Sequence, residues 1–283
     1  MQADAAFLSL DDLKGRNEHE NCCNIAGTDP TGGAGAQADL KTFMAHEVYG
    51  MSILTALVAQ NTTGVTSIMN VTPKFLKEQF DCVFTDIRPD AVKIGMVSQP
   101  ELIAVIVEKL KQYAVERIVV DPVMVSTSGS RLLEDTALEL LQTKLLPLAD
   151  IITPNLPEAE ALSGIRICNH QHMRKAAAMI AQDYDGYILI KGGHSMNRAD
   201  DLLVHKDEAH WLSSEKIDNP NTHGTGCTLS SAIAGNLALG YDMISAVERA
   251  KAFISGALRD GLDLGQGSGP LNHCWNIKQK QPL

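Results

Sequence analysis

Short runs of apolar residues, separated by polar and glycine-rich stretches, recur along the whole chain. The runs at 118–120, 151–152 and 187–190 are almost entirely apolar, which is typical of parallel strands buried on both faces. Between such runs lie longer stretches with apolar residues every three or four positions, as in amphipathic helices. These repeating strand-then-helix units predict an α/β fold with a single doubly wound, mostly parallel sheet flanked by helices.

The boundaries of the expected elements follow from the same pattern. Pro73 and Pro100 each suit the first turn of a helix. Strands are expected at 21–26, 49–62, 89–97, 117–124, 151–152, 187–190, 201–204 and 209–212, with 63–71 as a short strand or flap. Helices are expected to end at about 46, 85, 113, 145, 162, 183, 239 and 261.

Residues 221–228 read Asn-Thr-His-Gly-Thr-Gly-Cys-Thr and directly precede an apolar run that ends at Gly240. The first N–H groups of a helix have no partner within the helix, and the helix dipole makes this end positive. Glycine also lets the backbone bring several N–H groups to one point. The stretch therefore predicts an anion site at Gly224, Thr225 and Gly226, with Cys227 at its mouth. The alternative is a loop that only caps a buried helix.

Composition and charge narrow the possible functions. The net charge of −10 argues against a sequence-independent nucleic-acid surface, although N–H groups can still hold the phosphates of a nucleotide. Six cysteines without a CxxC pair argue against a zinc site and indicate a reducing cytoplasm. No apolar run approaches the roughly 18 residues of a membrane span. Residues 1–20 are expected to be a disordered or tag-like tail, and 21–283 a single domain.

Polar residues stand at the ends of several expected strands, where ligands of open α/β sheets bind. The Gln60 amide can both donate and accept, which fits the polar edge of a ring ligand, or it caps a loop. Asp121 could approach magnesium or phosphate, or form an Asp-Pro turn. Lys191 precedes two glycines and could lie along a triphosphate. Asn155 and Glu158 are spaced either for a shared site or for a helix cap.

Several segments together resemble the hydroxymethylpyrimidine and phosphomethylpyrimidine kinases of the ribokinase-like superfamily. They are the opening stretch 27–39, Gly-Thr-Asp-Pro-Thr-Gly-Gly-Ala-Gly-Ala-Gln-Ala-Asp, the stretch 221–228 and the ending 265–275. The resemblance runs from about Ile25 to about Trp275 with the motifs in the same order. The first strand, with Asn21 and Asn24, departs from the family, which is usually more apolar there.

The resemblance implies an ATP-dependent kinase of thiamine biosynthesis that phosphorylates the hydroxymethyl group of a pyrimidine and then the resulting monophosphate. Cys227 is the expected base, with a pKa lowered by the helix N-terminus. A homodimer is also implied. By the same resemblance the pyrimidine is held by Asp39, Gln60, Met96, Gly27 and Val123, the nucleotide by Lys191, Asp121, Asn155 and Thr222, and Mg²⁺ by Glu158 and Asn155 through water.

Three other interpretations stay open at this point. A pyridoxal or pyridoxine kinase of the same fold is the nearest, although Cys227 and Gln60 argue against it. A hydrolase or acyltransferase with a thiol nucleophile is suggested by His223, four residues before Cys227. A binding protein without catalysis is the third. The polar loop 126–130 is expected to be a lid or a phosphate contact.

Overall fold

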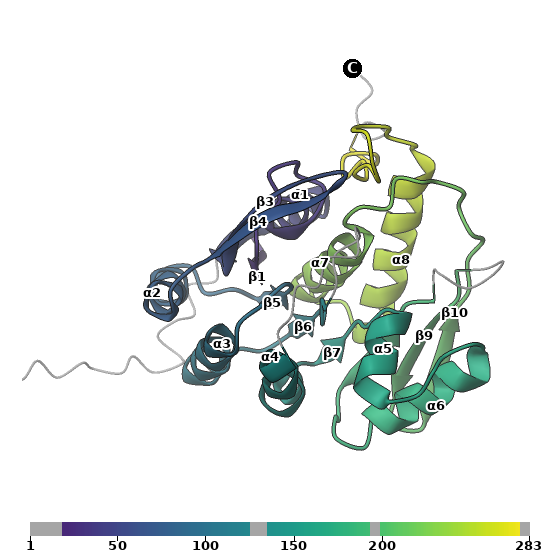
Figure 1. The fold of residues 1–283 in the computed structure, drawn as a ribbon, viewed down its shortest axis with the longest axis horizontal. Coiled ribbons are helices and arrows are strands. Elements are labelled where there is room, and N and C mark those ends of the chain that lie inside the picture. Colours follow the sequence, from purple (N-terminus) through teal and green to yellow (C-terminus); the bar gives the residue numbers. More distant parts are fainter. Residues whose placement is uncertain (1–18, 125–134, 193–198, 278–283) are drawn as a thin grey trace, which may run out of the picture.

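The computed structural model describes residues 19–124, 135–192 and 199–277 (Figure 1). The loop 126–130, expected to be a lid or phosphate contact, lies outside these residues, as does most of the expected tail. Glu20, at the end of that tail, is already tied to the fold, because its carbonyl accepts a hydrogen bond from the Tyr49 N–H at 3.0 Å.

The described elements follow the predicted alternation of strands and helices. Strands β1 to β10 are Asn21–Ala26, Tyr49–Leu54, Ala56–Asn61, Gly64–Asn70, Ala91–Ile94, Ile118–Val120, Ile151–Ile152, Tyr187–Ile190, Asp201–His205 and Glu208–Leu212. Helices α1 to α8 are Gly35–Ala45, Pro73–Phe84, Pro100–Gln112, Asp135–Leu140, Leu156–Ser163, His170–Ile180, Thr225–Ala238 and Met243–Arg259. The helix expected to reach residue 145 instead ends as an α-helix at Leu140 and continues as a π-helical turn, Leu141–Leu145.

Eight strands form one sheet in the order β10-β9-β8-β7-β6-β5-β1-β2. The neighbours from β2 to β8 are parallel, and β9 and β10 add an antiparallel edge. The doubly wound, mostly parallel sheet is therefore confirmed. The chain leaves β1 for β2 on one side and later returns to β5 on the other side, so the strand order reverses beside β1. Ligands of such folds bind beyond the carboxyl ends of strands at this reversal.

Helices cover both faces of the sheet (Figure 1). The helices α1, α7 and α8 lie on one face, and α2 to α6 on the other. Helix α7 is buried at every position from Thr228 to Ala238, as expected for a helix with small and aliphatic residues all round. Among the described residues, no helix is long and apolar enough to cross a bilayer.

The run 49–62 was expected to be one strand, and this prediction is wrong. The sheet strand β2 ends at Leu54, and β3 leaves the sheet to pair with β4 in an antiparallel hairpin. Thr55 fixes the break, because its N–H donates to Ala26 O at 3.0 Å and its hydroxyl to Met96 O at 2.8 Å. No Gly or Pro marks this bend, so the apolar pattern runs through it. Gln60 consequently lies on the hairpin.

Candidate active site

Helix α7 begins at the carboxyl edge of the sheet, behind β1, β5 and β6. Gly224 caps it with a left-handed φ of 79°, and the Gly224 carbonyl accepts from the Thr228 N–H at 2.9 Å. The N–H groups of Gly226 and Cys227 donate to no acceptor among the described residues. Two unpaired amides at a helix start are what an anion site requires, whereas the Thr225 N–H already donates to the Thr222 carbonyl at 3.2 Å. The anion site stays a prediction.

Gly224 also contacts the loop between β1 and α1. A Cβ added at Gly224 would lie 1.8 Å from the carbonyl oxygen of Gly33, so no side chain fits there. The two glycine-rich loops therefore meet backbone to backbone, which fixes the start of α7 against the start of α1.

A carboxylate that sequence reasoning did not single out ties these two loops together. Fully buried Asp29 accepts hydrogen bonds from the N–H groups of Thr31, Gly33 and Ala34, at 2.9, 3.1 and 2.8 Å. It also lies 2.7 Å from Nε2 of His223. The Asp-Pro-x-Gly-Gly pattern was the available signal, because a short acid followed by glycines commonly organises a turn.

The contact of His223 with Asp29 bears on the thiol-nucleophile interpretation. That interpretation needs a histidine beside the cysteine, whereas the His223 ring is held by a carboxylate of the other loop. No hydrogen bond joins His223 to Cys227 among the described residues. The structure therefore gives the hydrolase and acyltransferase interpretation no support.

The Asp29 cluster predicts a stability change at low pH. Burial alone would raise the pKa of Asp29, but the hydrogen bonds from His223, Thr31 and Ala34 lower it to about 2 from 3.8. A lowered pKa means that the stabilisation is complete above about pH 5 and is lost as the pH falls through 2. Between pH 6 and 2 the free energy of unfolding should fall about 2 kcal/mol more in the wild type than in Asp29→Asn. Urea unfolding of both proteins checks this, and parallel pH dependences would contradict it.

Two of the residues predicted to contact the nucleotide, Lys191 and Asp121, lie together beside α7. Lys191, directly after β8, places Nζ 2.7 Å from Oδ1 of Asp121, which follows β6. Thr153 donates to the same oxygen at 3.1 Å. A Cβ added at Gly226 would lie 3.2 Å from Oδ2 of Asp121 and 3.3 Å from Nζ of Lys191. A phosphate at the α7 amides would thus lie against an acid and an ammonium ion.

Asn155 and Glu158 form a reciprocal helix cap. The Asn155 side chain accepts from the Glu158 N–H at 2.9 Å, and the Glu158 carboxylate accepts from the Asn155 N–H at 2.8 Å. Burial raises the pKa of Glu158 to about 7, with Lys191 opposing and Asp121 adding to the shift. The described residues contain no cluster of three metal-binding side chains. One carboxylate with bound water still fits Mg²⁺, which usually keeps several waters.

Two of the residues predicted for the pyrimidine, Gly27 and Met96, follow β1 and β5 and lie against each other. A Cβ added at Gly27 would lie 3.3 Å from Cε of Met96 and 3.5 Å from Cγ2 of Val58. Gln60 follows Val58 by two positions on β3, and the pairing of β3 with β4 shifts register between Ala59 and Gln60. Val123 lies after β6, where its N–H donates to the Asp121 carbonyl at 2.8 Å.

Two predicted residues have partners that the sequence did not reveal. Asp39 is fully buried, and its carboxylate is held by Lys93, Asn24 and Ser231. Its contact with a pyrimidine amine stays a prediction, because this conformation exposes neither carboxylate oxygen. Thr222 is exposed, and its N–H donates to the Ser268 hydroxyl at 3.1 Å.

Cys227 is half-buried in the first turn of α7. Burial raises the pKa of its thiol, Lys93 and the Gly35 N–H lower it, and Asp39 and Asp121 raise it further. The expected lowering by the helix N-terminus is therefore wrong for this conformation, because desolvation outweighs the favourable charges.

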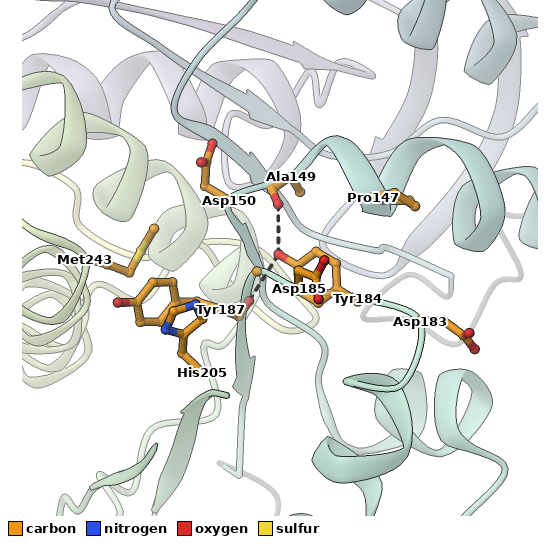
Figure 2. Close-up of a pocket in the computed structure, with 10 residues that line it drawn as sticks. Pro147, Ala149, Asp150, Asp183, Tyr184, Asp185, Tyr187, His205 and Met243 are labelled. Carbon is orange, nitrogen blue, oxygen red and sulfur yellow. Dashed lines mark hydrogen bonds between the residues drawn. The ribbon is translucent and has the colours of Figure 1, made fainter. Parts of the chain in front are cut away.

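A cavity of about 370 Å³ lies at the opposite edge of the sheet (Figure 2). Its lining includes Asp150 and Tyr187, where β7 and β8 begin, and none of the residues predicted for the site. Tyr184 lines the cavity, and its hydroxyl donates a hydrogen bond to the Ala149 carbonyl at 3.1 Å.

Comparison with known proteins shows which family the chain resembles. The sequence family described as phosphomethylpyrimidine kinase matches residues 29–272. A hydroxymethylpyrimidine/phosphomethylpyrimidine kinase of Rhizobium meliloti (strain 1021) is 47% identical over 254 residues, which cover 88% of this chain and 95% of that protein.

Solved structures of similar proteins indicate the same family and fold. The crystal structure of a phosphomethylpyrimidine kinase from Clostridium difficile 630 is 49% identical, with a TM-score of 0.76, and the match covers 83% of this chain and 98% of that one. An ADP complex of Bacillus subtilis pyridoxal kinase is 35% identical, with a TM-score of 0.85 over 92% of this chain and 99% of that one. The fold is thus ribokinase-like, and the chain belongs to the phosphomethylpyrimidine kinase family.

Proposed function

We propose that this chain transfers the terminal phosphoryl group of ATP to the hydroxymethyl oxygen of 4-amino-5-hydroxymethyl-2-methylpyrimidine, and then to the monophosphate formed. The observation that carries the proposal is the position of Cys227 and the free α7 amides. The Cys227 sulfur faces the N–H of Gly35, where an added Cβ would lie 2.4 Å from the Gly27 carbonyl. At Gly226, the residue before Cys227, an added Cβ would lie 3.2 Å from Asp121 and 3.3 Å from Lys191.

Phosphoryl transfer requires mainly positioning and charge neutralisation, and each need has a candidate in this site. The N–H groups of Gly226 and Cys227 would hydrogen-bond the transferred phosphoryl oxygens. Lys191 would exchange its contact with Asp121 for the nucleotide phosphates. Cys227, as a thiolate, would take the proton of the hydroxymethyl oxygen as the P–O bond forms.

Different groups of residues would recognise the two substrates. Gly27, Met96 and Gln60 would orient the pyrimidine, with Asp39 and Val123 as further proposed contacts. Thr222 and Asn155 would lie at the nucleotide. Glu158 and Asn155 would hold Mg²⁺ through water, and the metal would neutralise phosphate charge when bound.

The raised pKa of Glu158 predicts an acid limb in the pH profile. Below pH 7 the carboxyl is increasingly protonated and can no longer hold the metal, so kcat/KM for magnesium-ATP should fall about tenfold per pH unit. Glu158→Gln should be slow at every pH and should lack this limb. Glu248→Gln, at an exposed position on α8, is the matched control and should keep the wild-type profile. If Glu158→Gln kept the acid limb of the kcat/KM profile, the titrating group would be a residue other than Glu158.

Product analysis tests the proposed function. The protein is incubated with magnesium-ATP and the pyrimidine alcohol, and the products are separated by chromatography and weighed by mass spectrometry. Mono- and diphosphate are expected to appear in sequence. ATP turnover without a phosphorylated pyrimidine would refute the proposal.

Pyridoxal kinase activity is the second candidate, because the Bacillus subtilis pyridoxal kinase matches 92% of this chain. The same assay with pyridoxal decides between the two, through the ratio of the two kcat/KM values. A higher value for pyridoxal would reverse the assignment.

We also propose a single domain over residues 21–283 that acts as a homodimer in the cytoplasm. The hairpin supports self-association, because the cross-strand pair Leu57 and Met69 is 43% and 63% exposed. The six free cysteines are consistent with a reducing compartment.

A further inference from the structure

A buried polar cluster lies beneath the site, on the face of the sheet that α1 and α7 cover. It joins Lys93 of β5, Asp39 of α1, Asn24 of β1 and Ser231 of α7. The Lys93 ammonium lies 2.9 Å from both oxygens of Asp39, and both residues are fully buried. Asn24 Nδ2 and Ser231 Oγ donate to the same carboxylate at 2.8 and 2.6 Å. The cluster explains why Asn24, in the middle of the first strand, is an asparagine.

The cluster lies one helical turn below Cys227. Ser231 follows Cys227 by four positions on α7, and Asp39 follows Gly35 by four positions on α1. The Gly35 N–H is the backbone donor that faces the Cys227 sulfur. A Cβ added at Gly95 would lie 2.8 Å from the Lys93 Nζ, so the ammonium reaches past β5 toward the carboxyl edge of the sheet.

Stability alone is a weak reason for such a pair. Taking an ammonium and a carboxylate out of water costs about as much as their attraction returns, and apolar residues of similar volume often serve a core as well. Lys93 stands between Val92 and Ile94 in a strand that is buried at every position. The position of the charge, below the reacting thiol, therefore needs an explanation of its own.

We propose that the Lys93–Asp39 pair is a positioning device for phosphoryl transfer, in which Lys93 places a fixed positive charge beneath the Cys227 thiolate and Asp39 holds the ammonium there. The proposal rests on the role of Cys227 in the proposed function. When Cys227 takes the proton of the substrate hydroxyl, the thiolate becomes a neutral thiol, so the sulfur must be ionised beforehand. Burial works against this because it raises the pKa of the thiol, and a fixed positive charge nearby opposes that rise. Because Lys93 is fully buried, it would act through Cys227 and not by contact with the substrate.

Lys93 and Asp39 shift the pKa of the Cys227 thiol in opposite directions. Lys93 lowers the pKa of the thiol, whereas Asp39 and Asp121 raise it, and Lys191 adds a cation from the nucleotide side. Burial would lower the pKa of Lys93, but Asp39 raises it well above its ordinary value, so the ammonium persists at working pH. Loss of Lys93 should therefore raise the pKa of Cys227, and loss of Asp39 should lower it.

Site-specific alkylation measures this directly and needs no substrate. Iodoacetamide is reacted with the full chain between pH 6 and 10, and the Cys227 peptide is quantified by mass spectrometry. At pH 8, Lys93→Met should slow the alkylation of Cys227 about tenfold, equivalent to one pKa unit. Asp39→Asn should accelerate it several-fold, and the double variant Lys93→Met/Asp39→Asn should lie between the two.

The opposite changes in alkylation rate expected for Lys93→Met and Asp39→Asn distinguish an electrostatic role of the pair from a merely structural one. A pair that only supports packing would loosen the site in every variant and change the alkylation rate in one direction, which would overturn the proposal, as would no change. Lys109→Met is the matched control, because it breaks the Lys109–Asp81 ion pair of 2.6 Å between α3 and α2. It should leave Cys227 unaffected.

Folding and function are controlled separately. If Lys93→Met fails to fold, as judged by circular dichroism, Asp39→Asn and the double variant still test the sign, because the double variant must alkylate more slowly than Asp39→Asn. The pyrimidine product assay on the wild type tests the proposed function independently, so the two proposals can fail separately.

Discussion

Replacing Cys227 by alanine is expected to lower kcat about 100- to 10,000-fold, the usual range for a lost general base. The thiol is half-buried in the first turn of α7, and an alanine there leaves the amides and the glycine contacts in place. KM for the pyrimidine should therefore change little. Steady-state kinetics with saturating magnesium-ATP measure both parameters.

The exposed cysteine Cys82 supplies the matched control for this variant. Cys82→Ala removes a thiol from α2, on the opposite face of the sheet from α7, and should keep wild-type kinetics. A kcat for Cys227→Ala within a few-fold of wild type would remove this residue from the mechanism while leaving the fold and family intact.

Gly224→Ala is expected to abolish most activity and also to destabilise the fold. The left-handed φ of 79° costs an alanine roughly 1–2 kcal/mol, and its Cβ would overlap the Gly33 carbonyl at 1.8 Å. The two loops must then separate, which moves the α7 amides away from the phosphoryl position. The loss of one such donor costs about 100- to 1,000-fold in kcat. Kinetics and urea unfolding measure the two effects.

Gly240, at the other end of α7, separates backbone strain from the collision. Its φ is 86°, yet an added Cβ would meet no atom of the described residues within 4 Å. Gly240→Ala should lose only the roughly 1–2 kcal/mol of the backbone penalty and keep kcat. Equal effects at Gly224 and Gly240 would show that the contact between the two glycine-rich loops has no role in the reaction.

The hydrophobic pattern was sufficient for most of the fold, because burial on both faces leaves a strand little choice of residues. The apolar runs of β6, β7 and β8 and the buried helix α7, rich in small and aliphatic residues, were predicted within a few residues. The bend after Leu54 was not predictable, since Thr55 is held by hydrogen bonds from segments far along the chain, at Ala26 and Met96. Local sequence carries no trace of such partners.

In the candidate site, too, local features were predictable from the sequence and contacts between distant residues were not. Gly224, Gly226 and Cys227 were recognisable because a glycine-rich stretch before an apolar helix has one local physical meaning. Lys93 was not predicted as a site residue, because a single lysine in a short apolar strand usually indicates an exposed position. Its buried partner, Asp39, is 54 positions away in the sequence. Asp29 escaped notice for a similar reason, since its partner His223 is 194 positions distant.

The sequence by itself determined the alternation of elements, the α/β class, the helix start that can hold an anion and the membership suggested by its motifs. These features follow from neighbours along the chain, such as apolar periodicity, helix-terminal amides and glycine dihedrals. Only the tertiary structure decided which charges meet. The Lys93–Asp39 and Asp29–His223 pairs, and a Cys227 thiol whose pKa burial raises, arise from distant segments that share one desolvated space.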